Sequence, residues 1–224
     1  VGKVFRLHPE ENYITHMFEA CLLSSIRTAA CGVSALRILS QRVRAGASVG
    51  IIGAGRVGYY TALILTVLKE PAKILVYDIQ PDRAELLVDN ILSFYAEKVR
   101  GTVCITACRK DVFACNVLFL CTTAENPVLA PDETDSELVI SLGADTSSQR
   151  ELSDGWSRYK PVYVDSIDCR KVGDVRSWLE MALIEEEDLV EIFPAFYEGV
   201  CKSRTIPGSG QGDHCRRVFI STGT

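Results

Sequence analysis

The stretch VGIIGAGRVGYYTALIL, residues 49–65, places Gly53, Gly55 and Gly58 between an apolar run and a helix-like run. Glycine is favoured where the backbone must turn tightly or approach another group closely. The spacing GxGxxG, when it follows a buried strand and opens a helix, is typical of a loop that binds a dinucleotide, although the same spacing also occurs in turns that bind nothing. The segments on either side of the motif therefore decide between a nucleotide site and a tight turn.

A second apolar run, KILVYD, ends in Asp78 about 20 residues after the last glycine, the distance expected for the acidic residue of a dinucleotide site. In such a site Gly53 permits the turn, Gly55 lets a pyrophosphate approach the main chain, and Gly58 lets the helix pack against the strand. The matched strand, helix and acid favour a nucleotide site.

The start of the following helix supplies the phosphate-binding groups of this predicted site. Arg56 and Val57 fall in its first turn, where unpaired N–H groups and a partial positive charge favour anions. The carboxylate of Asp78 would accept hydrogen bonds from the ribose hydroxyls and repel a 2′-phosphate, which favours NAD over NADP. Arg83 follows a few residues later and keeps NADP open as an alternative.

Beyond the motif, short apolar runs alternate with longer mixed runs. A helix is expected to about Leu68, and DRAELLVDNILSFYAEKV predicts another. The short runs are KILVYD, TVCITA, NVLFLCT, LVISLGA and PVYVD. Strands without polar alternation are buried on both faces, as in a parallel sheet covered by helices. The pattern predicts an α/β fold with a Rossmann-type, doubly wound parallel sheet over residues 46–180.

The two ends of the chain have a different pattern. Before the motif we expect strand-like structure in KVFRL and YITHMF, and a helix from about Ser24 with Ser24 or Ser25 as its N-cap. A polar linker, QRVRAGAS, follows. After Leu179 we expect an acidic helical segment, EEEDLVEIF, then a loop, IPGSGQGDHCRR, and a last strand, VFIST.

Composition excludes several classes of function. The 224 residues include 24 basic and 29 acidic side chains, a net charge of −5 without a long block of one sign, which argues against binding nucleic acid or an anionic membrane. No apolar run reaches the roughly 18 residues that a membrane span needs, and no signal peptide is recognisable. We therefore expect a cytoplasmic protein with no membrane contact.

The cysteines and histidines point to no metal site. Nine cysteines are irregularly spaced without a CxxC pair, and several, such as Cys104 and Cys121, lie in apolar runs where a thiol acts as a small hydrophobe. His8, His16 and His214 match no zinc spacing. We expect reduced thiols and no bound metal.

Two later strands would deliver polar residues to the edge where ligands of open α/β sheets bind. NVLFLCT ends at Thr122, and LVISLGA leads into GADTSSQREL, which contains Asp145. An acid at a strand end beside a nicotinamide suits proton transfer. The alternative for Asp145 is a helix cap for the turn that follows.

The series SSIRTAACGVSAL, GIIGAGRVG, VYDIQPDRAELL, TTAENPVL, GADTSSQREL, VYVDS and VFISTG resembles the ornithine cyclodeaminase and mu-crystallin family in order and interval. The similarity covers the chain from about residue 8. RTAA ahead of the glycine motif and GADxxxxREL after it are the most specific elements, because ordinary Rossmann enzymes have neither.

The resemblance implies roles for several residues. Arg27 of RTAA would bind the α-carboxylate of a small amino-acid substrate through two parallel hydrogen bonds, and Asp145 would handle the proton or the water. Thr28 and Thr122 would contact the cofactor. NAD would take a hydride from the substrate Cα to give an imine that water or an internal amine attacks, with release of ammonia or ring closure. A surface ion pair is the alternative role for Arg27.

The resemblance also implies a division of the chain. Residues 1–45 would end a substrate and dimerisation domain, residues 46–180 would bind NAD, and residues 181–224 would return toward the first domain, so that remnants of a second domain lie at both ends. Relatives carry roughly a hundred further residues ahead of this point, so we expect either a piece of a longer protein or a shortened relative. A homodimer or higher homo-oligomer is expected.

Two other functions stay open. Gln149 stands where relatives often have lysine, which puts the substrate in doubt. The first alternative is an opine-type or amino-acid dehydrogenase, such as the oxidative enzyme of 2,3-diaminopropionate biosynthesis for siderophores. The second is a non-catalytic NAD(P)-binding module like mu-crystallin.

Overall fold

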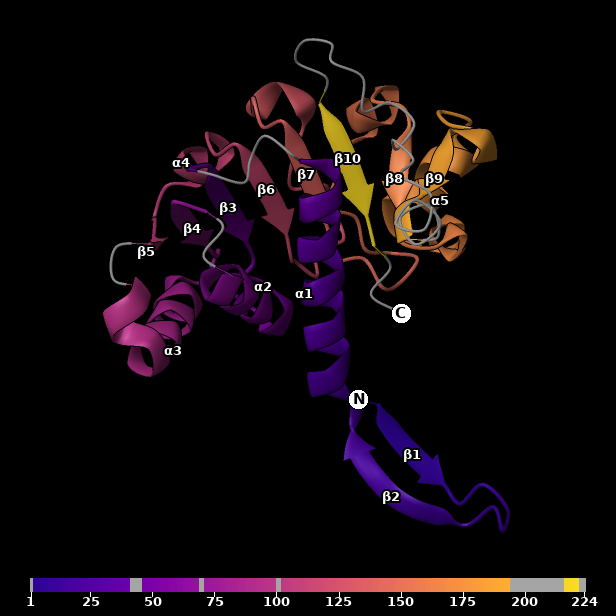
Figure 1. Ribbon diagram of the computed structural model, residues 1–224. Coiled ribbons are helices and arrows are strands. Elements are labelled where there is room, and N and C mark those ends of the chain that lie inside the picture. Colours follow the sequence, from indigo (N-terminus) through magenta and orange to yellow (C-terminus); the bar gives the residue numbers. More distant parts are fainter. Residues whose placement is uncertain (1, 41–45, 69–70, 100–101, 194–215, 222–224) are drawn as a thin grey trace.

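The centre of the molecule is an eight-stranded parallel sheet (Figure 1). The computed structural model describes residues 2–40, 46–68, 71–99, 102–193 and 216–221. The strands of the sheet are β3 (Ser48–Ile52), β4 (Lys73–Tyr77), β5 (Val103–Ile105), β6 (Val117–Leu120), β7 (Leu138–Ser141), β8 (Val162–Val164), β9 (Leu189–Glu191) and β10 (Arg217–Ile220). Their order is β5-β4-β3-β6-β7-β10-β8-β9, and every neighbouring pair is parallel. The predicted Rossmann-type sheet is confirmed.

The order of the strands creates a switch point beside β3. The chain runs outward from β3 through β4 to β5 and then crosses back to place β6 on the other side of β3. Ile52, the last residue of β3, is paired with Tyr77 on one side and Leu120 on the other. In open α/β sheets, ligands bind at the carboxyl edge of such a switch point. The glycine motif follows Ile52 directly and therefore lies at this point.

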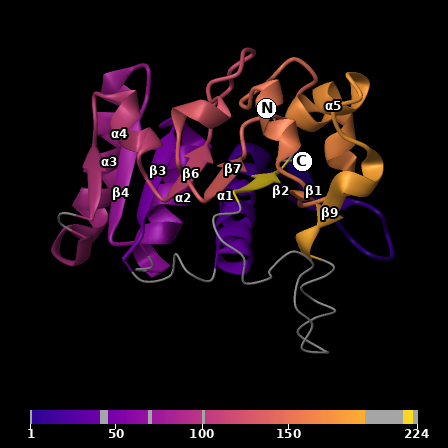
Figure 2. The ribbon, with the colours of Figure 1, turned by 90° about the horizontal axis from the view of Figure 1, so that it is seen from above.

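Helices cover both faces of the sheet. The helices α1 (Ala20–Leu39), α2 (Arg56–Leu68) and α3 (Pro81–Val99) contribute to one buried apolar cluster. The short helix α4 (Arg109–Phe113), the helix α5 (Gly173–Glu180) and the 3-10 helices η2 (Asp154–Arg158) and η3 (Ile167–Lys171) contribute to a second. Figure 2 shows α1 and α2 on the opposite side of the sheet from α4 and α5. Because adjacent strand residues face opposite ways, Ile51 belongs to the first cluster and Ile52 to the second.

The helix α1 begins four residues earlier than expected. Glu19, not Ser24 or Ser25, is the N-cap, and its two carboxylate oxygens accept the backbone N–H groups of Cys21 and Leu22, both at 2.8 Å. Ser25 instead donates its hydroxyl to the Cys21 carbonyl within the helix. A carboxylate that satisfies two free N–H groups of the first turn performs the function expected of a serine cap.

The same helix corrects the expectation that no apolar run could span a membrane. By length and composition α1 is apolar enough to do so. Yet 44% of its apolar window is buried inside the molecule, where α1 packs against α2 and β7. A helix in the core of a water-soluble protein meets the same criteria, so this feature is weak evidence for a membrane. Cytoplasmic location stays a prediction.

An antiparallel hairpin precedes α1. Its strands, β1 (Lys3–Leu7) and β2 (Ile14–Glu19), confirm the expected strand structure, and Figure 1 shows the hairpin projecting beyond the edge at which the sheet strands end. The hairpin exposes large apolar side chains, among them Phe5, Met17 and Phe18. Contiguous exposed apolar surface is typical of an interface. This is compatible with the predicted homo-oligomer, which stays a prediction.

Two segments after residue 180 join the main sheet. EEEDLVEIF, expected as a helix, forms the 3-10 turn η4 (Glu186–Asp188) and the edge strand β9, because Val162 and Tyr163 of β8 pair with its apolar residues. VFIST forms β10 as expected, between β7 and β8. Residues 206–215 of the expected loop lie outside the described residues. The three-part division of the chain stays a prediction.

We expect Ile74→Ala to lower the free energy of unfolding by about 2–5 kcal/mol, since the side chain in β4 is fully buried and its loss leaves a cavity. Ile79→Ala, a few residues later, removes a side chain that is 84% exposed and is expected to change stability by less than about 0.5 kcal/mol. Urea unfolding of both variants checks this. Equal effects would contradict the assignment of β4 to the core.

Candidate dinucleotide site

The turn after β3 depends on the absence of a side chain at Gly53. Its φ of +99° lies in the region that favours glycine. A Cβ at this position would lie 2.5 Å from the Cys121 carbonyl oxygen and 3.2 Å from the Thr122 nitrogen, both of which follow β6. Gly53 also donates its N–H to the Tyr77 carbonyl at the end of β4. The turn is therefore packed backbone against backbone with the strand ends on both sides.

The other two glycines of the motif have different surroundings. A Cβ at Gly58 would overlap the carbonyl oxygen of Gly53, so this glycine permits α2 to approach the turn. A Cβ at Gly55 would meet nothing within 4 Å, and Gly55 is exposed. Packing inside the protein thus accounts for Gly58 but not for Gly55. An open side at Gly55 fits a group that approaches the main chain from outside.

The first turn of α2 lies beside this opening. Arg56 and Val57 are the first two residues of the helix, and Tyr59 donates its N–H to the Gly55 carbonyl at 2.9 Å. The N–H groups of a first helical turn have no acceptor within their own helix. They give the opening a partial positive charge that suits a phosphate.

Asp78 is held against the glycine turn. One of its carboxylate oxygens accepts the Ala54 N–H at 2.7 Å, and the other accepts the Gln80 N–H at 2.8 Å. Each oxygen retains a further lone pair, so the carboxylate can accept additional hydrogen bonds. Asp78 is half-buried at the end of β4, which is the place that sequence reasoning assigned to the ribose-binding acid. The structure brings Gly53, Gly58 and Asp78 together.

Thr122 and Asp145 follow adjacent strands, β6 and β7. Thr122 donates both its N–H and its hydroxyl to Glu151, at 2.6 and 2.8 Å. Asp145 is exposed, and its N–H donates to the side-chain oxygen of Gln149 at 3.0 Å. In the turn QRELSDGW, the 3-10 helix η2 begins at Asp154 and has Ser153 as its N-cap, so the alternative role of Asp145 as a helix cap in this turn is wrong. The carboxylate of Asp145 faces solvent at the carboxyl edge.

Arg27 and Thr28 lie on α1, outside the glycine turn. Arg27 is exposed and Thr28 is buried. One helical turn after Arg27, the Cys31 thiol lies 3.8 Å from the Asp165 carboxylate and 3.8 Å from the Ser221 hydroxyl, which follow β8 and β10. These contacts place this part of α1 at the carboxyl edge of the sheet. The roles predicted for Arg27 and Thr28 stay predictions.

The thiols at this edge are held in the protonated form. Burial, followed by the nearby charge of Asp165, raises the pKa of Cys31 to about 12. Burial also raises the pKa of Cys121, and the Glu151 carboxylate adds to the effect. A thiolate nucleophile is therefore unfavourable at either position. Within the described ranges, no group of three His, Cys, Asp or Glu side chains is arranged to hold a metal ion.

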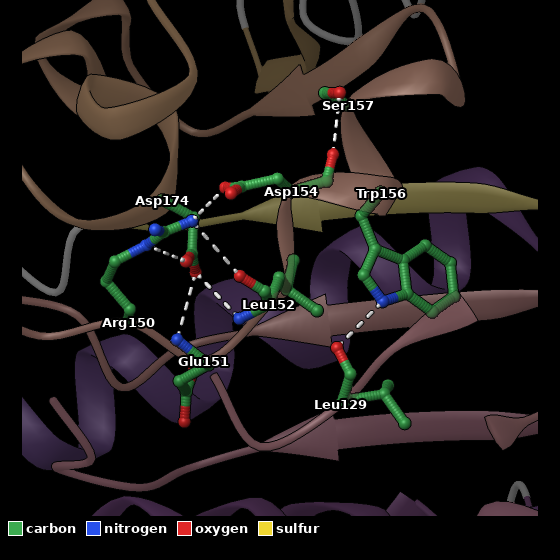
Figure 3. Close-up of polar contacts among 8 residues, drawn as sticks. All are labelled: Leu129, Arg150, Glu151, Leu152, Asp154, Trp156, Ser157 and Asp174. Atoms are coloured by element: carbon green, nitrogen blue, oxygen red, sulfur yellow. Dashed lines mark hydrogen bonds and ion pairs between the residues drawn. The ribbon is translucent and has the colours of Figure 1, made fainter. Parts of the chain in front are cut away.

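Sequence reasoning missed two buried carboxyl groups behind the edge. Glu151 lies beneath Thr122, and Asp174 accepts the backbone N–H groups of Glu151 and Leu152 at 3.1 and 3.2 Å (Figure 3). Arg150 adds ion pairs to Asp174 and to Asp154. Glu151 belongs to the REL motif, but its burial could not be predicted, since residues 143–152 have no helical or strand periodicity. Asp174 carried no signal, because its partners are more than twenty residues away in sequence.

A three-layer α/β structure with a glycine-rich turn at the switch point defines the class of Rossmann-like folds. A model of the ornithine cyclodeaminase/mu-crystallin family matches residues 4–206, and the chain belongs to that family. Among curated proteins, none matches significantly.

Several solved structures have the same fold. One is the Δ1-pyrroline-2-carboxylate reductase of Thermococcus litoralis, in complex with NADH and L-proline, with a TM-score of 0.80 and 20% identity over 98% of this chain and 65% of that one. Another is the iminosuccinate reductase of Paracoccus denitrificans, in complex with NAD⁺, with a TM-score of 0.75 and 20% identity over 98% and 64%. A lysine cyclodeaminase gives a TM-score of 0.72 and 19% identity over 98% and 60%. The chain thus spans less than two thirds of the length of these proteins.

Raising the pH from 5 to 8 should lower the free energy of unfolding of the wild type by on the order of 2 kcal/mol more than it lowers that of Asp174→Asn. Burial raises the pKa of Asp174 to about 7, against the opposing effect of its backbone donors and Arg150. An unfolded aspartate titrates near 4, so in this window the folded state holds the extra proton, and its stabilisation is lost as the pH rises through 7. Urea unfolding at both pH values measures the difference.

Asparagine is the matched substitution because it keeps one oxygen for the N–H groups of Glu151 and Leu152 but does not titrate. The same pH dependence in both proteins would show that Asp174 does not hold a proton in this range.

Proposed function

We propose that this chain binds NAD and belongs to an amino-acid-processing enzyme. The observation that carries the proposal is the combination of an open Gly55 and an Asp78 carboxylate fixed to the adjacent Ala54 N–H at the switch point. Membership of the ornithine cyclodeaminase/mu-crystallin family and the NAD or NADH bound to two structures of the same fold support it. The activity of the whole protein is part of the proposal.

Different residues of the turn would bind the pyrophosphate and the adenosine ribose of the dinucleotide. The main chain at Gly55 and the N–H groups of Arg56 and Val57 would receive the pyrophosphate, because nothing in the protein fills that side of the turn. Asp78 would accept the hydroxyls of the adenosine ribose with its remaining lone pairs. The negative charge of Asp78 disfavours a 2′-phosphate, so NAD is preferred, and Arg83 is the residue that would support NADP.

Thr122 and Thr28 would line the remainder of the cofactor site. Thr122 is fixed at the end of β6 by its two bonds to Glu151. Thr28 is buried on α1, one residue after Arg27. When bound, NAD would supply the acceptor for a hydride from the substrate.

Arg27 and Asp145 would act on the amino acid itself. Arg27 is exposed on α1 near the carboxyl edge, where its planar guanidinium can pair with an α-carboxylate through two hydrogen bonds. Asp145 is exposed at the end of β7, where a carboxylate can take a proton from the amino group or from an attacking water. The outcome we favour is release of ammonia, with or without ring closure, in which the bound cofactor would accept the hydride and later return it, so that no net oxidation occurs.

The first test separates ligand binding from folding at the glycine turn. Gly55→Ala should leave the unfolding temperature close to that of the wild type, since its Cβ meets no protein atom, but should weaken NADH binding by roughly 10-fold or more, because the Cβ enters the space of the pyrophosphate. Gly58→Ala should lower stability by about 1–3 kcal/mol, because its Cβ overlaps the Gly53 carbonyl. Calorimetric titration with NADH and thermal unfolding measure the two effects. Undiminished NADH binding by Gly55→Ala would remove the proposed pyrophosphate site.

The second test concerns the reaction. With an amino acid such as ornithine, NAD-loaded protein should show transient nicotinamide reduction by absorbance and should release ammonia. Asp145→Asn should slow this by about 10²–10⁴-fold while NAD affinity is retained, since only the proton transfer is removed. Asp89→Asn, an exposed acid on α3, is the control and should behave like the wild type.

A non-catalytic binding module, the main alternative, would bind NAD without any amino-acid-dependent reduction. Net reduction that persists, with NADH accumulating, would instead indicate an amino-acid dehydrogenase.

A further inference from the structure

The side chain of Glu151 joins the ends of two neighbouring strands. One carboxylate oxygen accepts the N–H and the hydroxyl of Thr122, at 2.6 and 2.8 Å, directly after β6. The other accepts the hydroxyl of Ser141 at 2.7 Å and the N–H of Gly143 at 2.9 Å, at the end of β7. Each oxygen therefore serves one strand end. Glu151 is fully buried, so water does not compete for these bonds.

The two strand ends that Glu151 joins also touch the glycine turn. A Cβ at Gly143 would overlap the Thr122 carbonyl oxygen and crowd the Glu151 carboxylate. On the other side, a Cβ at Gly53 would be too close to the Cys121 carbonyl and to the Thr122 nitrogen. Along the carboxyl edge, the main chain after β3 thus touches that after β6, which in turn touches that after β7. A movement of Thr122 would change the shape of the turn at Gly53.

We propose that Glu151 is a positioning residue of the dinucleotide site, which fixes the ends of β6 and β7 so that Thr122 and the Gly143–Asp145 segment face the cofactor across the glycine turn. This inference rests on the proposed NAD site. Glu151 is fully buried and acts through Thr122, Ser141 and Gly143.

The chemistry of the four partners requires a carboxylate. All four groups donate to Glu151, and an ionised carboxylate is an acceptor at every lone pair. Burial raises the pKa of Glu151, and the bonds from Ser141, Thr122 and Gly143 oppose that shift. A glutamine of the same shape would present its NH₂ group to one of the two backbone N–H groups and leave that strand end without an acceptor.

The backbone of Glu151 is fixed by hydrogen bonds to both its N–H and its carbonyl group. The Asp174 carboxylate accepts its N–H, and Arg150 holds Asp174 through an ion pair at 3.3 Å (Figure 3). The Glu151 carbonyl accepts the N–H groups of Val128 and Leu129. Because the main chain at residue 151 is fixed in this way, its side chain can impose a position on the strand ends. A buried network in which every member is satisfied is rigid.

The test is Glu151→Gln, compared with the wild type for NADH affinity by fluorescence titration and for amide hydrogen exchange. We expect the dissociation constant for NADH to rise about 10- to 100-fold, and the amide of Thr122 or of Gly143 to exchange faster, because one strand end loses its acceptor. Glu151→Asp keeps the charge but shortens the reach by one methylene, and it should show the same two effects. If Glu151→Gln fails to fold, Glu151→Asp alone tests the positioning role.

Two controls separate positioning from general destabilisation. Ile74→Ala weakens the same sheet away from the carboxyl edge and should leave NADH affinity within about 3-fold. Glu133→Gln removes a carboxylate that likewise accepts a backbone N–H, from Ala130 at 2.8 Å, but on the surface, and should change neither readout.

The outcomes distinguish this inference from the proposed function. Wild-type affinity for NADH in the folded Glu151 variants would overturn the positioning role and leave the NAD site standing. An equal loss of affinity in Ile74→Ala would also overturn it, because destabilisation alone would then explain the effect. A wild-type protein that binds no NADH would overturn the proposed function, and this inference with it.

Discussion

At the carboxyl edge of the sheet, the segments that follow β3, β6 and β7 pack main chain against main chain. Gly53 and Gly143 meet backbone atoms of the residues after β6, at distances that exclude a Cβ. Since the ends of β3, β6 and β7 are this close, few side chains fit between them, and polar groups must enter from outside. Asp78 enters from β4, and Glu151 enters from the loop after β7. The glycine motif is thus one part of a larger close-packed edge.

The helix α1 joins the core of the molecule to the hairpin beyond the carboxyl edge of the sheet. The C-terminal part of this helix is buried against β7 and α2, while its N-terminal part continues past the edge and carries the hairpin. Cys31 marks the level of the edge by its approach to Asp165 and Ser221. Arg27 therefore lies just beyond the strand ends on a helix whose base is fixed in the core. The backbone at Arg27 is therefore held at a fixed place relative to the sheet by the buried part of the helix.

The sequence predicts the sheet well because its strands are short apolar runs, and the glycine spacing predicts the switch point. The start of α1 was misplaced because the cap is a glutamate, whereas the rule favours serine. EEEDLVEIF was misjudged because pairing with β8 overrides a local preference. Glu151 and Asp174 could not be predicted as a buried pair, since their surroundings arise from segments that come together only in the folded chain. The periodicity of apolar residues predicts which face of a helix or strand is buried. Hydrogen bonds between loops produce no periodicity and cannot be predicted in this way.

The place of β10 has a consequence for how the protein reaches its final form. This strand is the last of the described elements, yet it lies between β7 and β8 and pairs with both. Until β10 is in place, β7 and β8 each have an open backbone edge, and no strand connects β8 and β9 to β7 and the strands beyond it. The sheet is therefore completed only when β10 pairs with both neighbours. During synthesis on the ribosome, β7 and β8 keep unpaired backbone edges until residues 217–220 have been made.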